Sequence, residues 1–350
     1  FGASESLPAM LETIGEVLMG DAAEIAVTQG KAVAVSTGGM LPQGSDAVVM
    51  VEYTQALGDG AIEVTRPVAP GENVLAVGED IGEGARIFSR GGRLRPQDIG
   101  VLAAVGLTQV GVYRKPKVAL ISTGDEIVPV HTQSVPPGKI RDINSFTLAA
   151  EMQSAGAEIG MRKTVPDSLD ELIAACLDAL GDHDMIVLSG GSSVGARDYT
   201  IRTLERLPDP ELLVHGVAIR PGKPTILGLS GKKLIWGLPG QPVSALITCR
   251  EFVVPSLEML HGRGEEGKRT AASFRAVLSR RLPSVHGRTD YIPVIISIGP
   301  NGLREAVPVF GKSGAIGILA RADGYVIVPE HVEGFDRGAE LSVFPFQHWG

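Results

Sequence analysis

Apolar runs alternate with helix-like segments through the middle of the chain, from about residue 115 to residue 262. The runs PKVALISTGDEI and HDMIVLSGG end in small polar residues, a pattern typical of buried strands followed by loops. Helices are predicted between such runs, the first with Asn144 or Ser145 as its cap, over residues 144–156, 168–180, 197–207 and 242–260. Because strands that alternate with helices are joined by right-handed crossovers, we expect an α/β domain with a mostly parallel sheet.

Short alternating strands bounded by Gly, Pro and Asp occupy both sides of this region. Before it, AEIAV, KAVAVSTGG, DAVVMVEYT and AIEVTRPV predict a β-rich domain over residues 1–82, and RPQDIGVLAAVG predicts a helix within residues 83–114. The opening FGASESLPAML has a turn-like composition and no initiating Met, and we interpret it as a start within a longer protein. After the charged segment GRGEEGKRT, further short strands predict a second β domain over residues 263–350.

Composition narrows the class of protein. With 350 residues, 44% of them hydrophobic and 21% charged, the chain is long enough for several globular domains. A net charge of −8 argues against a nucleic-acid-binding face, and the two cysteines, Cys176 and Cys249, lack the spacing of a zinc site or a disulfide framework. We expect no membrane span and no signal peptide, and therefore a cytoplasmic protein.

Glycine-punctuated loops follow several of the predicted strands. They are ISTGDE at 121–126, LSGGSSVGARDY at 188–199, RPGKP at 220–224 and GLPGQPVS at 237–244. Loops at the carboxyl ends of strands in an open α/β sheet converge on one crevice, and glycine lets backbone N–H groups approach an anion closely. These loops indicate a site for a phosphorylated ligand, although each taken alone is equally compatible with a tight turn that binds nothing.

The role of each polar side chain on these loops has two interpretations. Asp125, Glu126 and Asp198 are either solvated or capping groups, or carboxylates that hold a divalent cation against a phosphate. Arg220 and Lys223 are either surface cations on a turn or oxyanion ligands. The GLPGQPVS turn is either an anion or pterin wall, or a well-formed start of a helix.

The same blocks carry a family resemblance. The segments STGDE, PPGKIRDINS, SGGSSVGARDY, HGVAIRPGKP and GLPGQPVSAL resemble successive blocks of the molybdopterin-binding domain of MoeA-type molybdopterin molybdenumtransferases, the family of the gephyrin E domain. STGGMLPQGSDAVVMVE and NVLAVGEDIGEGA resemble the β-rich domain of that family, and PVFGKSGAIGILARADGYVIVPE resembles its C-terminal β-barrel. The resemblance implies a central molybdopterin-binding α/β domain at 115–262, with the β-rich domain at 1–82, the remainder of an elongated dimer-forming domain at 83–114 and the barrel at 263–350.

The resemblance also implies a reaction. It is the Mg²⁺-dependent insertion of molybdate into adenylylated molybdopterin, with release of AMP, in molybdenum cofactor biosynthesis. A homodimer whose site lies between two subunits and a MogA-type adenylyltransferase as a partner are implied as well. The alternative is a non-catalytic molybdopterin-binding or scaffold module on the same fold.

Residue roles are carried over at the positions that match the family's blocks. The acidic set around metal and pyrophosphate, with one hydroxyl, is Asp198, Glu126, Asp167, Asp80 and Thr37, of which Glu126 and Asp198 are the implied metal ligands. The implied ligands of the pterin and the anions are Gly190, Gly191, Ser193, Arg220, Lys223, Pro239, Pro242 and Ser313.

The chain departs from the family pattern at a few positions. The family's Asp-Gly-Tyr-Ala motif does not occur in these 350 residues, so either it lies outside this sequence or this member lacks it, which leaves activity and dimerisation open. Gln241 stands where the family has Asn, Arg220 stands where Lys is common, and Ala196-Arg197 replace a more acidic pair. These changes leave the choice between molybdate and tungstate open.

Overall fold

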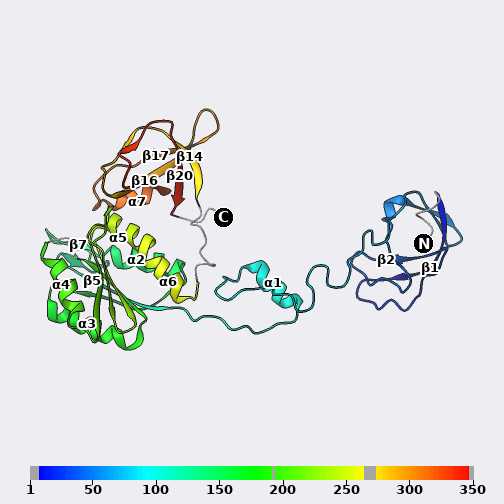
Figure 1. Cartoon of the computed structure of the whole chain (residues 1–350), viewed down its shortest axis with the longest axis horizontal. Helices are drawn as coiled ribbons and strands as arrows, with labels where there is room; N and C mark the ends of the chain where they lie inside the picture. Colours follow the sequence, from blue (N-terminus) through cyan, green and yellow to red (C-terminus); the bar gives the residue numbers. More distant parts are fainter. Residues whose placement is uncertain (1–7, 191–193, 264–272, 347–350) are drawn as a thin grey trace. The chain divides into compact units, whose positions relative to one another are not determined.

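The computed structural model describes residues 8–190, 194–263 and 273–346, with side chains omitted for 194–198. The chain divides into two compact units, Phe1–Ser89 and Arg90–Gly350, each with its own core (Figure 1). Within the described residues, no helix is long and apolar enough to cross a membrane.

The N-terminal unit is a small β domain, as the short strand runs predict. Its four-stranded sheet has the order β2-β1-β4-β3 and packs Ala9, Leu11 and Val64 into its core. Sequence reasoning missed the first strand, in which Ala9 and Leu11 are buried and alternate with exposed neighbours. The segment AEIAV forms only an isolated bridge through Ala26. The elements are β1 (Ala9–Val17), β2 (Lys31–Val35), a 3₁₀ turn (Val51–Tyr53), β3 (Thr54–Gly58) and β4 (Ala61–Val64).

A mixed six-stranded sheet forms the centre of the second unit, in the order β10-β12-β13-β9-β5-β8. The four strands β13, β9, β5 and β8 run parallel, as predicted, whereas β12 is antiparallel to both β13 and β10. Only Gly231 and Lys232 connect β12 to β13, and so short a link allows a hairpin but no crossover. The strands are β5 (Lys117–Thr123), β8 (Glu158–Val165), β9 (Met185–Gly190), β10 (Pro210–His215), β12 (Ile226–Ser230) and β13 (Lys233–Leu238).

Helices cover both faces of this sheet, which explains why its central strands are apolar throughout. Val118 and Leu120 of β5 pack on one face with helices α2, α5 and α6, while Ala119 and Ile121 pack on the other with α3 and α4 (Figure 1). The helices are α2 (Asn144–Ser154), α3 (Leu169–Asp182), α4 (Val194–Leu204), α5 (Pro242–Thr248) and α6 (Val254–Leu260).

The predicted helix over 242–260 is interrupted by a π-helical turn, Cys249–Val253, between α5 and α6. Pro255 has no N–H to donate to Glu251, and its ring crowds the carbonyl at that position. The wider turn accommodates this defect, so the chain continues as a helix to Leu260.

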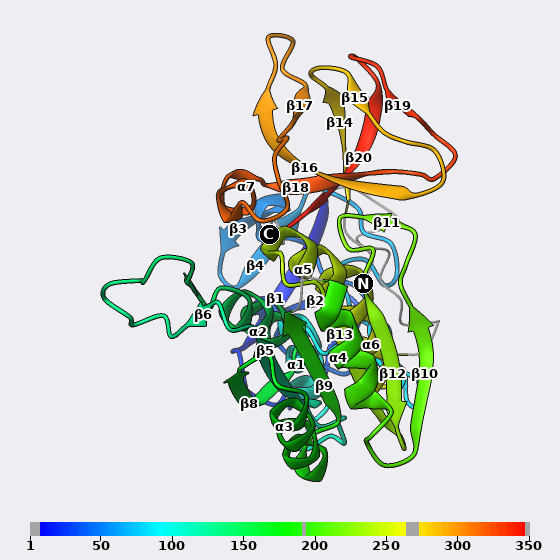
Figure 2. The same cartoon turned by 90° about the vertical axis from the view of Figure 1, so that its left-hand side faces the viewer.

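The C-terminal domain is a closed barrel, as predicted. Five strands pair in the order β16-β17-β14-β20-β18, and a further pairing of β18 with β16 closes the ring (Figure 2). A short strand, β11 (Ile219–Arg220), pairs in parallel with the start of β16 and so links the central domain to the barrel. The barrel elements are β14 (Phe274–Leu278), β16 (Thr289–Ile298), β17 (Arg304–Pro308), α7 (Ile316–Arg321), β18 (Gly324–Val328) and β20 (Glu340–Pro345).

A few short elements complete the second unit. Helix α1 begins at Pro96 and ends before Gly106, as its sequence predicts, and Asp98 accepts a hydrogen bond from the Arg95 backbone at its start. Two-residue strand pairs occur in the loop after β5 and at the edge of the barrel. These elements are α1 (Pro96–Ala104), β6 (Ile127–Val128), β7 (Ile140–Arg141), β15 (Leu282–Pro283) and β19 (Gly334–Phe335).

Candidate functional site

The loops after β5 and β9 start side by side at the carboxyl edge of the central sheet. Thr123, the last residue of β5, pairs with Gly190, the last residue of β9. A Cβ atom at Gly190 would lie 2.2 Å from the Thr123 carbonyl oxygen, closer than any side chain tolerates. Glycine at this position therefore lets the two strand ends approach closely.

Three carboxylates gather just beyond β5 and β8; we call Asp125, Glu126 and Asp167 the acidic loop. The Thr123 hydroxyl donates to Asp167 Oδ1 at 2.8 Å, and the Asp167 backbone N–H donates to Asp125 Oδ1 at 3.1 Å. The Glu126 carboxylate lies over Gly124, where a Cβ would come within 2.7 Å of Oε2.

Neutral donors bind the carboxylates of Asp167 and Asp125, and the Lys139 ammonium group donates to the Asp125 backbone carbonyl oxygen at 2.6 Å. Asp125 and Glu126 are exposed and Asp167 is half-buried. Within the part of the chain that the structure describes, none of the three forms an ion pair. The three carboxylates are therefore available to a further cation, with Lys139 beside Asp125.

Asn144, at the start of α2, links the end of β9 to the turn before α5. The Asn144 side-chain amide donates to Ser189 Oγ and to the Gly240 carbonyl oxygen, both at 2.9 Å. The prediction that Asn144 or Ser145 caps α2 is wrong, because the Asp142 carboxylate accepts from the Ser145 backbone N–H at 3.0 Å and neither residue's own side chain does so. Sequence reasoning named neither Asp142 nor Asn144 as a site residue, although both lie in the PPGKIRDINS block that carries the resemblance.

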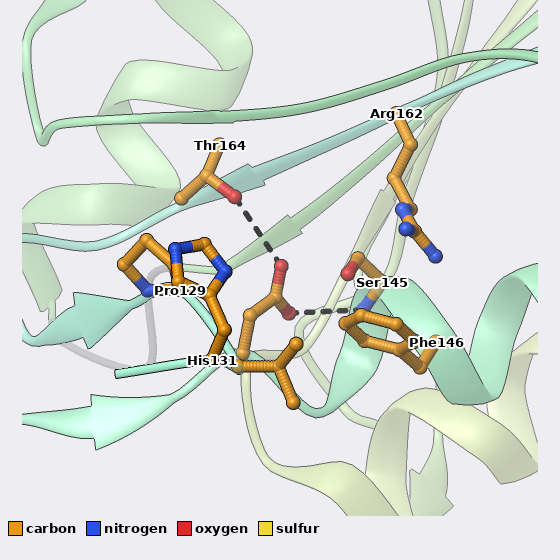
Figure 3. Close-up of a pocket in the computed structure, with 8 residues that line it drawn as sticks. Pro129, His131, Ser145, Phe146, Arg162 and Thr164 are labelled. Carbon is orange, nitrogen blue, oxygen red and sulfur yellow. Dashed lines mark hydrogen bonds between the residues drawn. The ribbon is translucent and has the colours of Figure 1, made fainter. Parts of the chain in front are cut away.

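A cavity of about 230 Å³ opens beside the start of α2 (Figure 3). Asp142 lines it and accepts a hydrogen bond from the Thr164 hydroxyl at 3.3 Å. The Arg162 guanidinium lies over the Phe146 ring, 4.1 Å from its centre. None of the predicted site residues lines this cavity, whose lining is Pro129, Val130, His131, Asp142, Ser145, Phe146, Arg162 and Thr164.

Arg220, a predicted anion ligand, forms an ion pair with a residue of the barrel. Its guanidinium lies 2.8 Å from Asp290 Oδ2. The Asp290 carboxylate is fully buried and also accepts from Arg288 at 3.1 Å and from the Ser284 hydroxyl at 2.8 Å. Lys223 of the same RPGKP loop is exposed and forms no ion pair with any described residue.

The turn before α5 meets a loop of the barrel. Pro242 occupies the first turn of α5, and the backbone N–H of Val243 donates to the Ser313 carbonyl oxygen at 3.0 Å. The Ser313 hydroxyl donates to the side-chain oxygen of Gln241. Ser313 and Pro242, predicted to share a site from separate parts of the sequence, are thus brought together, while Pro239 is buried at the end of β13.

Other predicted site residues lie elsewhere. Gly191, Ser193 and the side chain of Asp198 fall outside the described residues, although Asp198 belongs to α4. Thr37 is exposed in the turn after β2, and Asp80 is exposed further along the N-terminal unit.

Three family models match successive parts of the chain. They are described as "MoeA N-terminal region (domain I and II)" at residues 1–106, "Probable molybdopterin binding domain" at 119–259 and "MoeA C-terminal region (domain IV)" at 275–346. The molybdopterin molybdenumtransferase of Haemophilus influenzae is 31% identical over 91% of this chain and 78% of its own length. That of Bacillus subtilis is 31% identical over 97% of this chain and 79% of its own length.

Solved structures agree with the sequence relatives. A molybdopterin biosynthesis MoeA protein from Pyrococcus horikoshii OT3 superposes with a TM-score of 0.77 at 32% identity, covering 99% of this chain and 84% of that one. This chain belongs to the MoeA family. The expected domain types are those of the family, with a molybdopterin-binding α/β domain between an N-terminal β-containing region and a C-terminal barrel.

Mg²⁺ is the cation that the MoeA family resemblance implies, and the acidic loop is its candidate binding site. The described residues contain no group of three or more His, Cys, Asp or Glu side chains arranged to hold a metal ion. Mg²⁺ in phosphate-binding sites uses one or two carboxylates, with water and phosphate oxygens completing its shell. The oxygen chemistry and the free charge of the acidic loop fit that mode of binding.

Proposed function

We propose that this MoeA-family chain inserts molybdate into adenylylated molybdopterin and releases AMP, in a Mg²⁺-dependent step of molybdenum cofactor biosynthesis. One observation carries the proposal. The ends of β5 and β9 meet at Thr123 and Gly190, beside an acidic loop whose three carboxylates form no ion pair among the described residues. A pyrophosphate link with a divalent cation needs such an arrangement, in which small backbone groups approach the phosphates and carboxylates face the metal.

The acidic loop would hold the cation. We assign Glu126 and Asp198 as the metal ligands and Asp167 as the carboxylate that orients them and the pyrophosphate. When bound, Mg²⁺ neutralises charge on the pyrophosphate oxygens as AMP leaves. Thr123 contributes by fixing Asp167 through its hydroxyl, so that the carboxylate does not have to reorganise when the ligand arrives.

Cations and backbone groups would hold the anionic parts of the substrates. Arg220 is oriented by Asp290 and remains partly exposed, so its other N–H groups are available to an oxyanion such as molybdate or tungstate. Lys223 adds a mobile charge on the same loop. Gly190, Gly191, Ser193, Pro239, Pro242 and Ser313 complete the proposed walls for the pterin and its phosphate.

Further parts of the proposal concern other surfaces and partners. Thr37 and Asp80 belong to the N-terminal unit, and we propose that they complete a site in a homodimer, as the family resemblance implies. A MogA-type adenylyltransferase would supply the adenylylated substrate. The proposed setting is the cytoplasm.

The direct test measures AMP release from adenylylated molybdopterin with molybdate, with and without EDTA. We expect chelation to stop the release, and Glu126→Gln or Asp198→Asn to slow it by about 100-fold or more, because each removes one charged metal ligand. Asp170→Asn is the control, since Asp170 lies on α3 with 92% of its side chain exposed. Unchanged AMP release in both site variants would falsify the assignment of the acidic site.

The same assay addresses the alternative. Calorimetry with molybdopterin detects binding without turnover. Tight binding by the unmodified chain, with no AMP released in the presence of Mg²⁺ and molybdate, would reject the transferase and favour a non-catalytic molybdopterin-binding module.

A further inference from the structure

Hydroxyl groups line the carboxyl edge of the central sheet on the face that α2 covers. Ser122 of β5 is paired in register with Thr164 of β8 on one side and with Ser189 of β9 on the other. All three lie on the same face of the sheet as Met185 and Val187 of β9, since side chains alternate along each strand. The edge of the core that faces α2 is therefore polar.

The first turn of α2, with Asp142 just before it, forms hydrogen bonds to the hydroxyl groups at both ends of this row. Asp142 binds the Thr164 hydroxyl and Asn144 binds the Ser189 hydroxyl. Ser122, between them, is only 1% exposed, and its Oγ has no partner among the described residues. Among the described residues, the hydrogen bonds at Thr164 and Ser189 therefore attach the start of α2 to this edge of the sheet.

Asn144 makes two contacts through a single NH₂ group. The Gly240 carbonyl can only accept a hydrogen bond, which fixes the amide so that its nitrogen faces Gly240 and Ser189. Ser189 immediately precedes Gly190 at the end of β9, and Gly240 lies between Pro239 and Gln241 in the turn before α5. One side chain from a third element thus sets the separation of two loops that contain proposed ligand-binding residues.

We infer that Asn144 is a positioning residue, which holds the end of β9 and the turn before α5 at the spacing that the phosphorylated pterin requires. This inference rests on the proposed function. Asn144 acts through Ser189 and Gly240 and does not have to touch the substrate. Because the loops bind the substrate in its ground state, loss of the spacing raises KM for adenylylated molybdopterin more than it lowers kcat.

The experiment compares Asn144→Ala and Asn144→Asp with Thr147→Val in the full chain. Thr147 lies one turn further along α2, and among the described residues its hydroxyl bonds to the carbonyl oxygen of Ile143, the residue before the helix, at 3.2 Å. Asn144→Asp keeps the size of the side chain but places an acceptor against the Gly240 carbonyl. We expect KM to rise about tenfold in both Asn144 variants, with kcat reduced less than threefold and Thr147→Val unchanged.

A double-mutant cycle with Ser189→Ala separates positioning from general damage. Ser189→Ala should raise KM in the wild-type background and add little in Asn144→Ala, because the shared contact is already lost. An unchanged KM in both Asn144 variants overturns the inference. The inference is also overturned if Asn144→Ala and Thr147→Val both lose thermal stability and show equal losses in kcat and in kcat/KM.

A second measurement keeps this inference separate from the proposed function. If the unmodified chain releases no AMP, the transferase proposal fails, and hydrogen exchange then tests Asn144 on its own. We expect faster exchange at the amides of Ser189 and Gly190 and of Gly240 and Gln241 in Asn144→Ala, with no change in Thr147→Val. Unaltered exchange at both segments in Asn144→Ala overturns the inference whatever the activity.

Discussion

Two carboxylate clusters of the second unit use their charge in different ways. The acidic loop exposes Asp125 and Glu126, leaves Asp167 partly accessible, and binds its carboxylates with neutral donors. The other cluster buries Asp290 completely between Arg220 and Arg288. Both clusters lie at ends of strands, yet among the described residues only the second has carboxylate oxygens in ion pairs.

The difference follows from the cost of burying charge. A carboxylate removed from water is destabilising unless cations and hydrogen bonds replace the lost hydration, and Asp290 has two arginines and the Ser284 hydroxyl for this purpose. The acidic loop stays hydrated and needs no such partner. It therefore retains its charge for a ligand, while the charge of Asp290 serves to orient Arg220.

The strongest test of this comparison is Asp290→Asn. Removing the buried charge leaves two guanidinium groups facing a neutral amide, and we expect the barrel to lose about 2 to 3 kcal/mol of stability. The expected loss of stability is smaller than for a fully buried ion pair, because the Arg220 and Arg288 side chains are 47% and 34% exposed. Hydrogen exchange of the β16 amides in the full chain measures the loss.

A matched control uses an ion pair at the surface of the same barrel. Arg281 and Asp336 lie 3.7 Å apart with side chains that are 79% and 92% exposed. Asp336→Asn should change the stability by less than about 0.5 kcal/mol. Equal effects of the two substitutions would show that burial of Asp290 does not matter.

Much of the fold follows from local patterns in the sequence. The apolar runs ending at Thr123 and Gly190 predict β5 and β9, and Pro96 and Gly106 delimit α1 correctly. Patterns of this kind do not determine strand order, so they predict neither the antiparallel β12 nor the closure of the barrel by β16 and β18. The first strand was missed because its alternation of Ala9 and Leu11 is short and follows a turn-like segment.

The candidate site was predictable to a smaller extent. Register places Thr123 beside Gly190, and this pairing follows from the rule that parallel strand ends converge. The partners of Arg220 and Asn144 are distant in sequence, and no local pattern in the chain reveals Asp290 or Gly240 as their contacts. Such contacts depend on how domains and loops pack, which only the folded structure specifies.

The comparison also includes Cys176, a buried thiol whose environment favours its neutral form. Burial in the core between α3 and the sheet raises the pKa of its thiol from 9.0 to about 12. Between these values the unfolded chain releases a proton that the folded chain retains, so this contribution is complete below pH 9 and is lost as the pH rises toward 12. We expect a loss of roughly 1 kcal/mol per pH unit above pH 9 from this thiol.

Urea unfolding of wild type and Cys176→Ala between pH 8 and pH 10 measures this effect. The chain has two tryptophans, so a Trp349→Phe background leaves Trp236 of β13 as the fluorescent reporter of the same sheet. Cys176→Ala should lose less stability than wild type as the pH rises. Parallel pH profiles would mean that the thiol ionises equally in the folded and unfolded chain.

The smallest effect is expected for Asp167→Asn, and its sign sharpens the comparison. The amide oxygen of Asn can still accept from the Thr123 hydroxyl, so the local geometry is kept while one of three neighbouring negative charges is removed. Relief of like-charge repulsion should leave the free energy of unfolding unchanged or raise it by up to about 0.5 kcal/mol, because exposed charges interact weakly in water. AMP release should fall at the same time, since the lost charge belongs to the proposed metal site. A fall in stability comparable to that of Asp290→Asn would instead place Asp167 among the structural charges and leave the acidic loop without a free carboxylate at β8.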